Sequence, residues 1–226
     1  MAMARTIKST SMETKDKFTL SSYRSIDCII LFLENNLPEF ASININSTLG
    51  EEDLNQQLHI FLQGKNSTQQ LKEEMQFIFV QSYKEEKSLR KVDIGVVINA
   101  QLKSQSKAFF TIECKRLPTP CKARKKEYVC GNLGAMERFK REHHGRGLSH
   151  SAIIAYVEKE IFNYWFNEIN NWIQELCDDN SDNSIRWDTN DLLIEQYQKD
   201  IIAKYQSKNK RKEDAIRLIH LWIKMH

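Results

Sequence analysis

Apolar residues recur along the chain with two spacings, which predict helices and strands in a definite order. Spacings of three and four positions predict helices over 26–36, 47–65 and 159–177. Alternating or continuous apolar runs predict strands over 75–83, 91–98, 108–117 and 150–158. A basic stretch over 122–142, which contains two glycines, predicts a further helix. A helix, three strands, a helix and another strand are typical of an α/β fold with mixed strand directions.

The boundaries of these elements carry further signals. Ser47 or Thr48 is expected to cap the second helix, whose first turn is acidic. The polar stretch 99–107 is expected to connect two strands as a hairpin, and 178–191 to form an acidic loop. Two alternating sets in the final apolar stretch, "IRLIHLWIK", favour a strand over a helix. We expect His220 in that stretch to be a hydrogen-bonded core residue.

The composition is that of an ordinary globular protein. Hydrophobic residues make up 41% and charged residues 28% of 226 residues, enough for one substantial core, so we expect a single domain over 1–226. No apolar run approaches the roughly 20 residues that span a bilayer. The best candidate, 26–33, lies too far along the chain to be a signal peptide. We therefore expect a cytoplasmic protein with no membrane partner and with reduced cysteines.

Two of the predicted strands carry charges that a strand core should reject. The strand "KVDIGVVI" contains Asp93, and "AFFTIECKRL" contains Glu113 and Lys115. Residues i and i+2 of a strand share a face, so Glu113 and Lys115 point the same way. If the two strands pair antiparallel, Asp93 lies beside both of them. The apolar flanks indicate strands buried on both faces, so the three charges are expected to meet at a partly buried point.

This combination of charges predicts a chemistry. Converging carboxylates repel each other and lose hydration, so the cluster is costly unless a cation neutralises it. Oxygen ligands favour a hard ion, and Mg²⁺ is the usual one because it keeps several waters. A nearby lysine can orient or activate a water, or stabilise charge that develops on a phosphate. Together these groups are suited to hydrolysing a phosphodiester bond.

Asp93, a gap of 19 residues and then Glu113-Cys114-Lys115 resemble the D…(D/E)-x-K signature of the PD-(D/E)XK nuclease superfamily. Its restriction-endonuclease-like core has the element order α-β-β-β-α-β, which matches the order predicted from about 47 to 158, here with N- and C-terminal additions. The additional segment 159–226 is expected to pack on that core. The resemblance implies an endo- or exonuclease that uses Mg²⁺, with Mn²⁺ able to substitute; it favours DNA as the substrate and leaves RNA open. Defence against foreign DNA is a role found in this superfamily.

Many members of this superfamily also bring a glutamate from the first core helix to the metal. In "GEEDLNQQL", Glu51 falls on the same helical face as Leu54 and Leu58, toward the sheet, whereas Glu52 lies about a quarter-turn aside. The resemblance therefore implies that Glu51 joins Asp93 and Glu113 as a metal ligand, with Glu52 as the second choice. Both glutamates equally fit a role in which they only complement the helix N-terminus.

Positive charge is concentrated directly after the E-x-K motif. Residues 115–146 hold ten basic and three acidic residues, a net charge of +7, whereas the whole chain carries +3. A protein that binds a phosphate backbone needs positive charge beside its active site. Within this segment, "EYVCGNLGAMERFKREHHG" resembles the stretch that follows the motif in some defence-associated members. The residues expected to contact nucleic acid are Lys125, Lys126, Arg138 and Lys140.

Other interpretations stay open at this point. Asp93, Glu113 and Lys115 could also form ion pairs with a purely structural role. The basic segment could likewise be a solvent-exposed helix face. The chain could keep the fold as a catalytically inactive nucleic-acid-binding or assembly component, as a homodimer or with a partner protein that supplies targeting. A zinc site could combine three cysteines with one histidine, although the cysteine spacings are not the usual short ones. Its ligands would be Cys114, Cys121, Cys130 and either His143 or His144, and neither histidine belongs to the expected catalytic set.

Overall fold

The computed structural model describes residues 12–68, 77–85, 90–98, 107–179, 182 and 184–226, with side chains described from residue 24 onward. The elements, in chain order, are α1 (Met12–Ile43), α2 (Glu51–Thr68), β1 (Phe77–Lys84), β2 (Lys91–Ile98), β3 (Phe110–Leu117), the 3-10 turn η2 (Lys122–Arg124), α3 (Ala135–Lys140), β4 (His150–Val157), α4 (Phe162–Asp178), the 3-10 turn η3 (Thr189–Asp191), β5 (Ile194–Gln198), β6 (Ile202–Lys210) and β7 (Ala215–Lys224).

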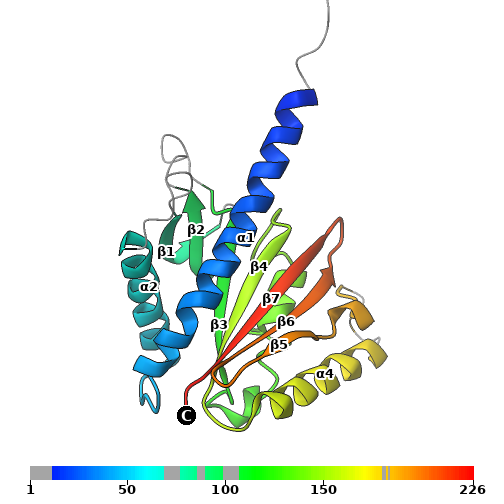
Figure 1. The fold of residues 1–226 in the computed structure, drawn as a ribbon. Coiled ribbons are helices and arrows are strands. Elements are labelled where there is room, and N and C mark those ends of the chain that lie inside the picture. Colours follow the sequence, from blue (N-terminus) through cyan, green and yellow to red (C-terminus); the bar gives the residue numbers. More distant parts are fainter. Residues whose placement is uncertain (1–11, 69–76, 86–89, 99–106, 180–181, 183) are drawn as a thin grey trace, which may run out of the picture.

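The described strands form one seven-stranded sheet in the order β1-β2-β3-β4-β7-β6-β5 (Figure 1). Strands β1, β2 and β3 are antiparallel neighbours, whereas β4 lies parallel to both β3 and β7. Strands β6 and β5 continue the sheet in antiparallel pairs. The expected α/β fold with mixed strand directions is confirmed, and so is the antiparallel pairing of the two charged strands.

Each face of the sheet has its own apolar core. Helices α1 and α2 cover one face, where Ile112 and Ile154 are buried beneath them; Figure 1 shows α1 crossing the sheet. On the opposite face, α3 and α4 pack over Ile153 and Ala155. Successive residues of a strand alternate between faces, so Cys114 belongs to the α1 face, and its neighbours Glu113 and Lys115 belong to the α3 face.

The first two helices differ in their limits from the sequence prediction. Helix α1 extends beyond 26–36 at both ends and continues past Pro38, although proline supplies no backbone N–H. Helix α2 begins at Glu51, where the Leu54 amide donates to the Gly50 carbonyl at 3.0 Å, so the expected cap at Ser47 or Thr48 is wrong. None of the described helices is long and apolar enough to cross a lipid bilayer.

The prediction of one basic helix over 122–142 is wrong. The segment contains the short turn η2 and the six-residue helix α3, and its two glycines separate them. Gly131 has a φ of 100°, which side-chain-bearing residues rarely adopt. A Cβ atom on Gly134 would lie 2.4 Å from the carbonyl carbon of Cys130, so the chain can turn tightly there only without a side chain.

The C-terminal strand is confirmed as β7, but β5 and β6 were not predicted. Strand β6 buries Ser207 and Asn209, and these polar residues at core positions hide the alternation that would identify a strand. The predicted hairpin connection at 99–107 lies almost wholly outside the described residues.

His220 lies in a buried network that explains the polar positions of β6 and β7. Its Nδ1 is 2.7 Å from the Tyr128 hydroxyl, and its Nε2 is 2.9 Å from the Ser207 hydroxyl. Trp222 Nε1 donates to the same Tyr128 oxygen at 2.9 Å. The expectation of a hydrogen-bonded core histidine is confirmed. Because both ring nitrogens are engaged away from water, burial lowers the pKa of His220 to about 3.

We predict that His220→Gln lowers the free energy of unfolding near neutral pH, and that the variant loses less stability than the native protein as the pH falls. In the unfolded chain His220 takes up a proton below its ordinary pKa of 6.5, whereas the folded chain resists protonation down to about 3. The native protein should therefore lose roughly 1.4 kcal/mol per pH unit from this residue as the pH falls through that range, and the variant should not. Denaturant unfolding of both proteins at neutral and mildly acidic pH measures the difference. Equal losses would contradict a buried neutral His220.

Candidate active site

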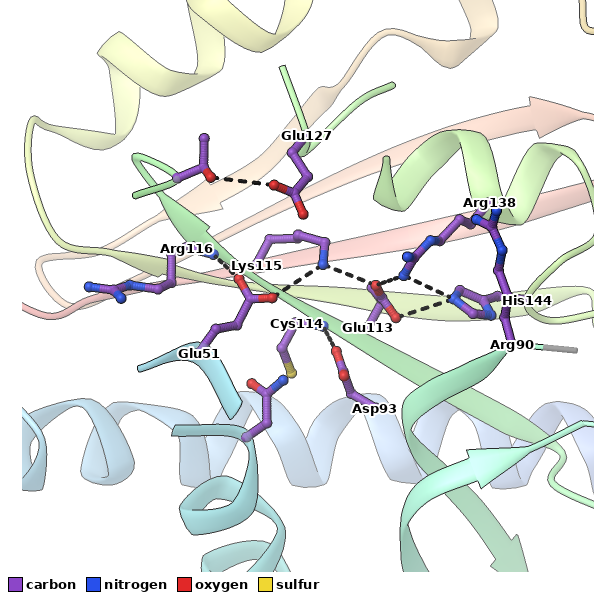
Figure 2. Close-up of polar contacts among 12 residues, drawn as sticks. Glu51, Arg90, Asp93, Glu113, Cys114, Lys115, Arg116, Glu127, Arg138 and His144 are labelled. Carbon is purple, nitrogen blue, oxygen red and sulfur yellow. Dashed lines mark hydrogen bonds and ion pairs between the residues drawn. The ribbon is translucent and has the colours of Figure 1, made fainter. Parts of the chain in front are cut away.

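Strands β2 and β3 separate part-way along their length, which leaves one edge of β3 without a neighbouring strand. Their pairing runs from Val96 with Phe110 to Ile94 with Ile112 and goes no further. Two carboxylates occupy the gap (Figure 2). The Cys114 amide donates to Asp93 Oδ2 at 2.7 Å, and the Arg116 amide donates to Glu51 Oε2 at 3.2 Å. Since buried backbone N–H groups require partners, these bonds hold both carboxylates against the strand.

Glu113 and Lys115 extend from the same stretch of β3 toward the α3 face. The two side chains are only 2% and 7% exposed, and Lys115 Nζ lies 3.1 Å from Glu113 Oε1. Lys115 Nζ also lies 3.3 Å from Glu51 Oε1. The structure thus brings together Glu51, Asp93, Glu113 and Lys115, which come from α2, β2 and β3. The predicted strand pairing placed three of them together, and the resemblance implied that Glu51 joins them.

The structure also distinguishes between the two candidate glutamates of α2. Glu51 is one-third exposed and contacts both Lys115 and the β3 backbone. Glu52, one position later, is exposed to solvent and takes no part in these contacts. Glu51 is therefore the acidic residue of this helix that lies in the cluster.

Two residues that the sequence did not place in the cluster lie next to Glu113. Arg138 Nη1 donates to Glu113 Oε1 at 2.9 Å, with an Arg138 side chain only 12% exposed. His144 is fully buried, with its Nε2 3.5 Å from Glu113 Oε2. Helix α3 is too short to show a sequence period, so no local pattern places them here. A buried carboxylate needs more than one hydrogen-bond donor, so the sequence could have indicated that Glu113 has partners besides Lys115.

The cluster shifts the pKa values of its members in different directions. Burial and the charge of Glu113 raise the pKa of Asp93 to about 8. Burial opposes ionisation of Glu113, but Lys115, His144 and Arg138 outweigh it and lower the pKa. Burial also opposes the charge on Lys115, but Glu113, Glu51 and Asp93 outweigh it and raise its pKa. Burial lowers the pKa of His144 to about 4. Near neutral pH, Lys115 is a cation, Glu113 an anion and His144 neutral.

Three buried polar atoms in this cluster have no hydrogen-bond partner among the described residues: Glu113 Oε2, Arg138 Nε and His144 Nδ1. Buried atoms of this kind are usually paired, and an unpaired one is costly. Their concentration around Glu113 indicates an arrangement that is not optimised for the stability of the chain alone.

Lys140 is buried within the fold, so the expectation that it contacts nucleic acid is wrong. Its ammonium group lies 2.7 Å from Asp191 Oδ1 and 2.8 Å from Oδ2, and neither side chain is exposed. The ring of Trp187 lies 4.9 Å from the same nitrogen. Asp191 comes from the end of the expected acidic loop, far from Lys140 in the sequence. The basic residues around Lys140 predicted that it is exposed, but pairing with this distant aspartate allows it to be buried.

The other basic residues of the segment differ in their surroundings. Lys125 is exposed, as are Lys122 and Arg124 on η2. Lys126 is one-third exposed and forms an ion pair with Glu175 of α4. Arg138 lies inside the cluster rather than on the open surface. We refer to residues 122–126 as the loop surface.

Within the described ranges, no group of three or more His, Cys, Asp or Glu side chains is placed to hold a metal ion. Sites for Mg²⁺ commonly use only one or two carboxylates, with waters as the other ligands. Asp93 and Glu113 are the two acids that could form that smaller set, because Asp93 accepts from the β3 backbone directly after Glu113 and the charge of Glu113 raises the pKa of Asp93.

No model of a known protein family matches the chain, and neither a curated protein nor a solved structure matches it. What this cluster can do therefore follows from its geometry and charges.

We predict opposite effects on metal-free stability from two nearly isosteric changes. Asp93→Asn should raise the free energy of unfolding near pH 8 by an amount on the order of 1 kcal/mol. It removes a carboxyl group whose ionisation is opposed by burial and by the charge of Glu113. The raised pKa means that native stability falls as pH rises from the ordinary value of 3.8 to about 8, and the variant should not show this fall.

Glu113→Gln should lower the free energy of unfolding by roughly 3 kcal/mol, because it leaves Lys115 and Arg138 buried without their anion. Denaturant unfolding in the presence of a chelator measures both variants. Stabilisation by Glu113→Gln would contradict the ion-pair assignment, and a pH profile of Asp93→Asn that matches the native one would contradict the Asp93 pKa.

Proposed function

We propose that this chain is a Mg²⁺-dependent nuclease that hydrolyses phosphodiester bonds, with DNA as the favoured substrate and defence against foreign DNA as a role it would suit. The observation that carries the proposal is the convergence of Glu51, Asp93, Glu113 and Lys115 at the free edge of β3. Three carboxylates at one partly buried point are costly. Carboxylates that can hold Mg²⁺ and a lysine that can stabilise charge on a phosphate are suited to phosphodiester hydrolysis.

The arrangement of elements is compatible with the PD-(D/E)XK superfamily that the motif resembles. Helix α2, the antiparallel strands β1 to β3, the α3 segment and the parallel strand β4 follow one another in the expected order. We propose that residues of about 47–158 form a restriction-endonuclease-like core, to which α4 and strands β5 to β7 are added.

Asp93 and Glu113 would hold the metal ion, with Glu51 beside them. Glu113 Oε2 supports this assignment, because it is a buried acceptor without a hydrogen-bond partner in the described part of the chain, and the nitrogen beside it, His144 Nε2, lies 3.5 Å away. Asp93 supports it as well, because its pKa stays raised although Lys115 is near, so a further cation bound beside it would favour its ionisation. When bound, Mg²⁺ would supply a more acidic water and neutralise charge on the phosphate, and Mn²⁺ could substitute.

The residues of the chain have separate roles in this proposal. Lys115 is a cation held at fixed distances by Glu51 and Glu113, so it would present a preorganised positive charge to the reacting phosphate. Its raised pKa makes it unsuited to accept a proton from water. Arg138 would hold Glu113 in position from the other side. Cys114, between the two motif residues, points to the opposite face.

The loop surface would hold the phosphate backbone. Its exposed residues Lys122, Arg124 and Lys125 line a cavity of ≈ 870 Å³ together with Lys126. Arg124 is close enough to Glu51 for the two charges to interact, so this surface adjoins the cluster. Of the residues expected from the sequence to contact nucleic acid, Lys125 and Lys126 keep that role in the proposal.

One observation favours a second candidate, a nucleic-acid-binding or assembly protein without catalysis. Glu113 Oε1 already accepts from both Lys115 and Arg138, which is what a structural ion-pair network would show. The catalytic proposal accounts better for Asp93 and Glu51, because a pure binder gains nothing from further carboxylates that face phosphates.

The test of the proposed function is metal-dependent cleavage by matched variants. We predict that Asp93→Asn and Glu113→Gln each abolish cleavage, and that Glu51→Gln lowers its rate. Glu52→Gln is the matched control, since it removes the same charge one residue away at a solvent-exposed position and should leave the rate unchanged. Cleavage by both Asp93→Asn and Glu113→Gln would exclude this cluster as the active site.

Lys115→Ala separates the lysine from the metal ligands. An ammonium group does not coordinate Mg²⁺, so calorimetry should still detect metal binding by the variant. Turnover should fall on the order of 100- to 1,000-fold, the usual loss for one preorganised electrostatic group. Single-turnover cleavage measures this step. A rate near that of the native protein would mean that the E-x-K motif is coincidental.

A further inference from the structure

The loop surface lines the first of three neighbouring cavities. The second, of ≈ 250 Å³, shares Gly131 and Asn132 with the first and is also lined by Arg90 and Arg138. The third, of ≈ 470 Å³, shares Arg141 and His143 with the second. Shared lining residues place the three cavities in series along one side of the molecule.

The middle cavity adjoins the candidate active site through Arg138. This residue lines the cavity and also donates to Glu113 Oε1 at 2.9 Å. In Figure 2, Lys115, Glu113 and Arg138 follow one another across the site, with Arg90 beyond them. A nucleic-acid strand bound to the loop surface could therefore pass Glu113 and continue toward the third cavity.

The third cavity is basic, and its positive charge is only partly neutralised. Arg141 is engaged by Glu137 and Asp182, and Lys140 is buried with Asp191. Three further cations that line it are exposed, and no ion pair found among the described residues involves them. They are Arg186, Lys210 and Lys212, and we refer to them as the hairpin surface, since two of them lie at the turn between β6 and β7.

The hairpin surface is fixed to the α3 segment by specific contacts. Arg211, buried between Lys210 and Lys212, donates from Nε to the Phe139 carbonyl at 2.9 Å. Arg141 donates to the Ser184 hydroxyl at 2.7 Å, which holds the loop that carries Arg186. These contacts set the positions of the exposed cations relative to Arg138 before any ligand arrives, and a preorganised site loses less entropy on binding.

We propose that the hairpin surface is a second phosphate-binding site, which holds the same nucleic-acid strand on the far side of the scissile bond from the loop surface. Its ligand is the phosphodiester backbone, recognised by charge and not by base identity. The inference rests on the proposed function, and it extends the substrate path from the E-x-K segment to the C-terminal hairpin.

The test is the affinity of Arg186→Ala/Lys212→Ala for labelled DNA and RNA oligonucleotides of increasing length, measured by fluorescence anisotropy. Asp93→Asn is present throughout to prevent cleavage. Arg24→Ala/Arg217→Ala is the matched control: both arginines are exposed and belong to the α1 side of the sheet. Long oligonucleotides should bind the test variant roughly tenfold more weakly, with a salt dependence lower by about one log–log unit for each phosphate-binding cation removed. Short ones that reach only the loop surface should bind equally.

An affinity and salt slope equal to those of the control would overturn the second site and leave the proposed function standing. No metal-dependent cleavage by the native chain, with binding still weakened in the test variant, would overturn the nuclease and leave the basic path standing. No nucleic-acid binding at all would overturn both. Thermal unfolding checks that the double variant is folded; if it is not, Lys212→Gln alone should weaken binding in the same way, with the smaller change in salt slope that removing a single cation produces.

Discussion

The candidate site depends on the place where β2 leaves β3. Beyond Ile112, the amides of Cys114 and Arg116 have no strand to bond, and a buried amide without a partner is costly. Asp93 and Glu51 supply the missing acceptors. The need to pair these two backbone amides thereby fixes the positions of two carboxylates. Because side chains alternate between the two faces of β3, Glu113 and Lys115 lie together on the same stretch of the strand. The sheet thus holds four ionisable groups in place through main-chain geometry, without relying on flexible surface side chains.

This arrangement has a cost that the chain offsets only in part. Lys115 and Arg138 neutralise Glu113, but Asp93 stays difficult to ionise, and Glu113 Oε2 has no hydrogen-bond partner among the described residues. Such residual cost is common where side chains are positioned for a ligand. By contrast, the network around His220 satisfies both nitrogens of a fully buried imidazole. One atom linked to that network, Asn209 Oδ1, lacks a hydrogen-bond partner in the described chain, against three atoms around Glu113, and this difference favours a functional role for the Glu113 cluster.

The sequence predicted those parts of the structure that depend on local periodicity. Alternation along 108–117 places Glu113 and Lys115 on one face, and the helical period of α2 places Glu51 toward the sheet. The failures involve distant partners. Lys140 is buried because Asp191, 51 positions away, neutralises it. Arg138 and His144 reach Glu113 after a turn that Gly131 and Gly134 create. Ser207 hides β6 because its partner His220 lies on β7, and Asn209 bonds in turn to Ser207. Periodicity carries no information on such pairings.

The most direct test of this account is the incubation of the purified native chain with plasmid DNA, single-stranded DNA and RNA, with Mg²⁺ and with a chelator. The native chain should cleave at least one substrate with Mg²⁺ and none with the chelator. The account would be contradicted if a chain shown to be folded cleaved none of the three with Mg²⁺ or Mn²⁺.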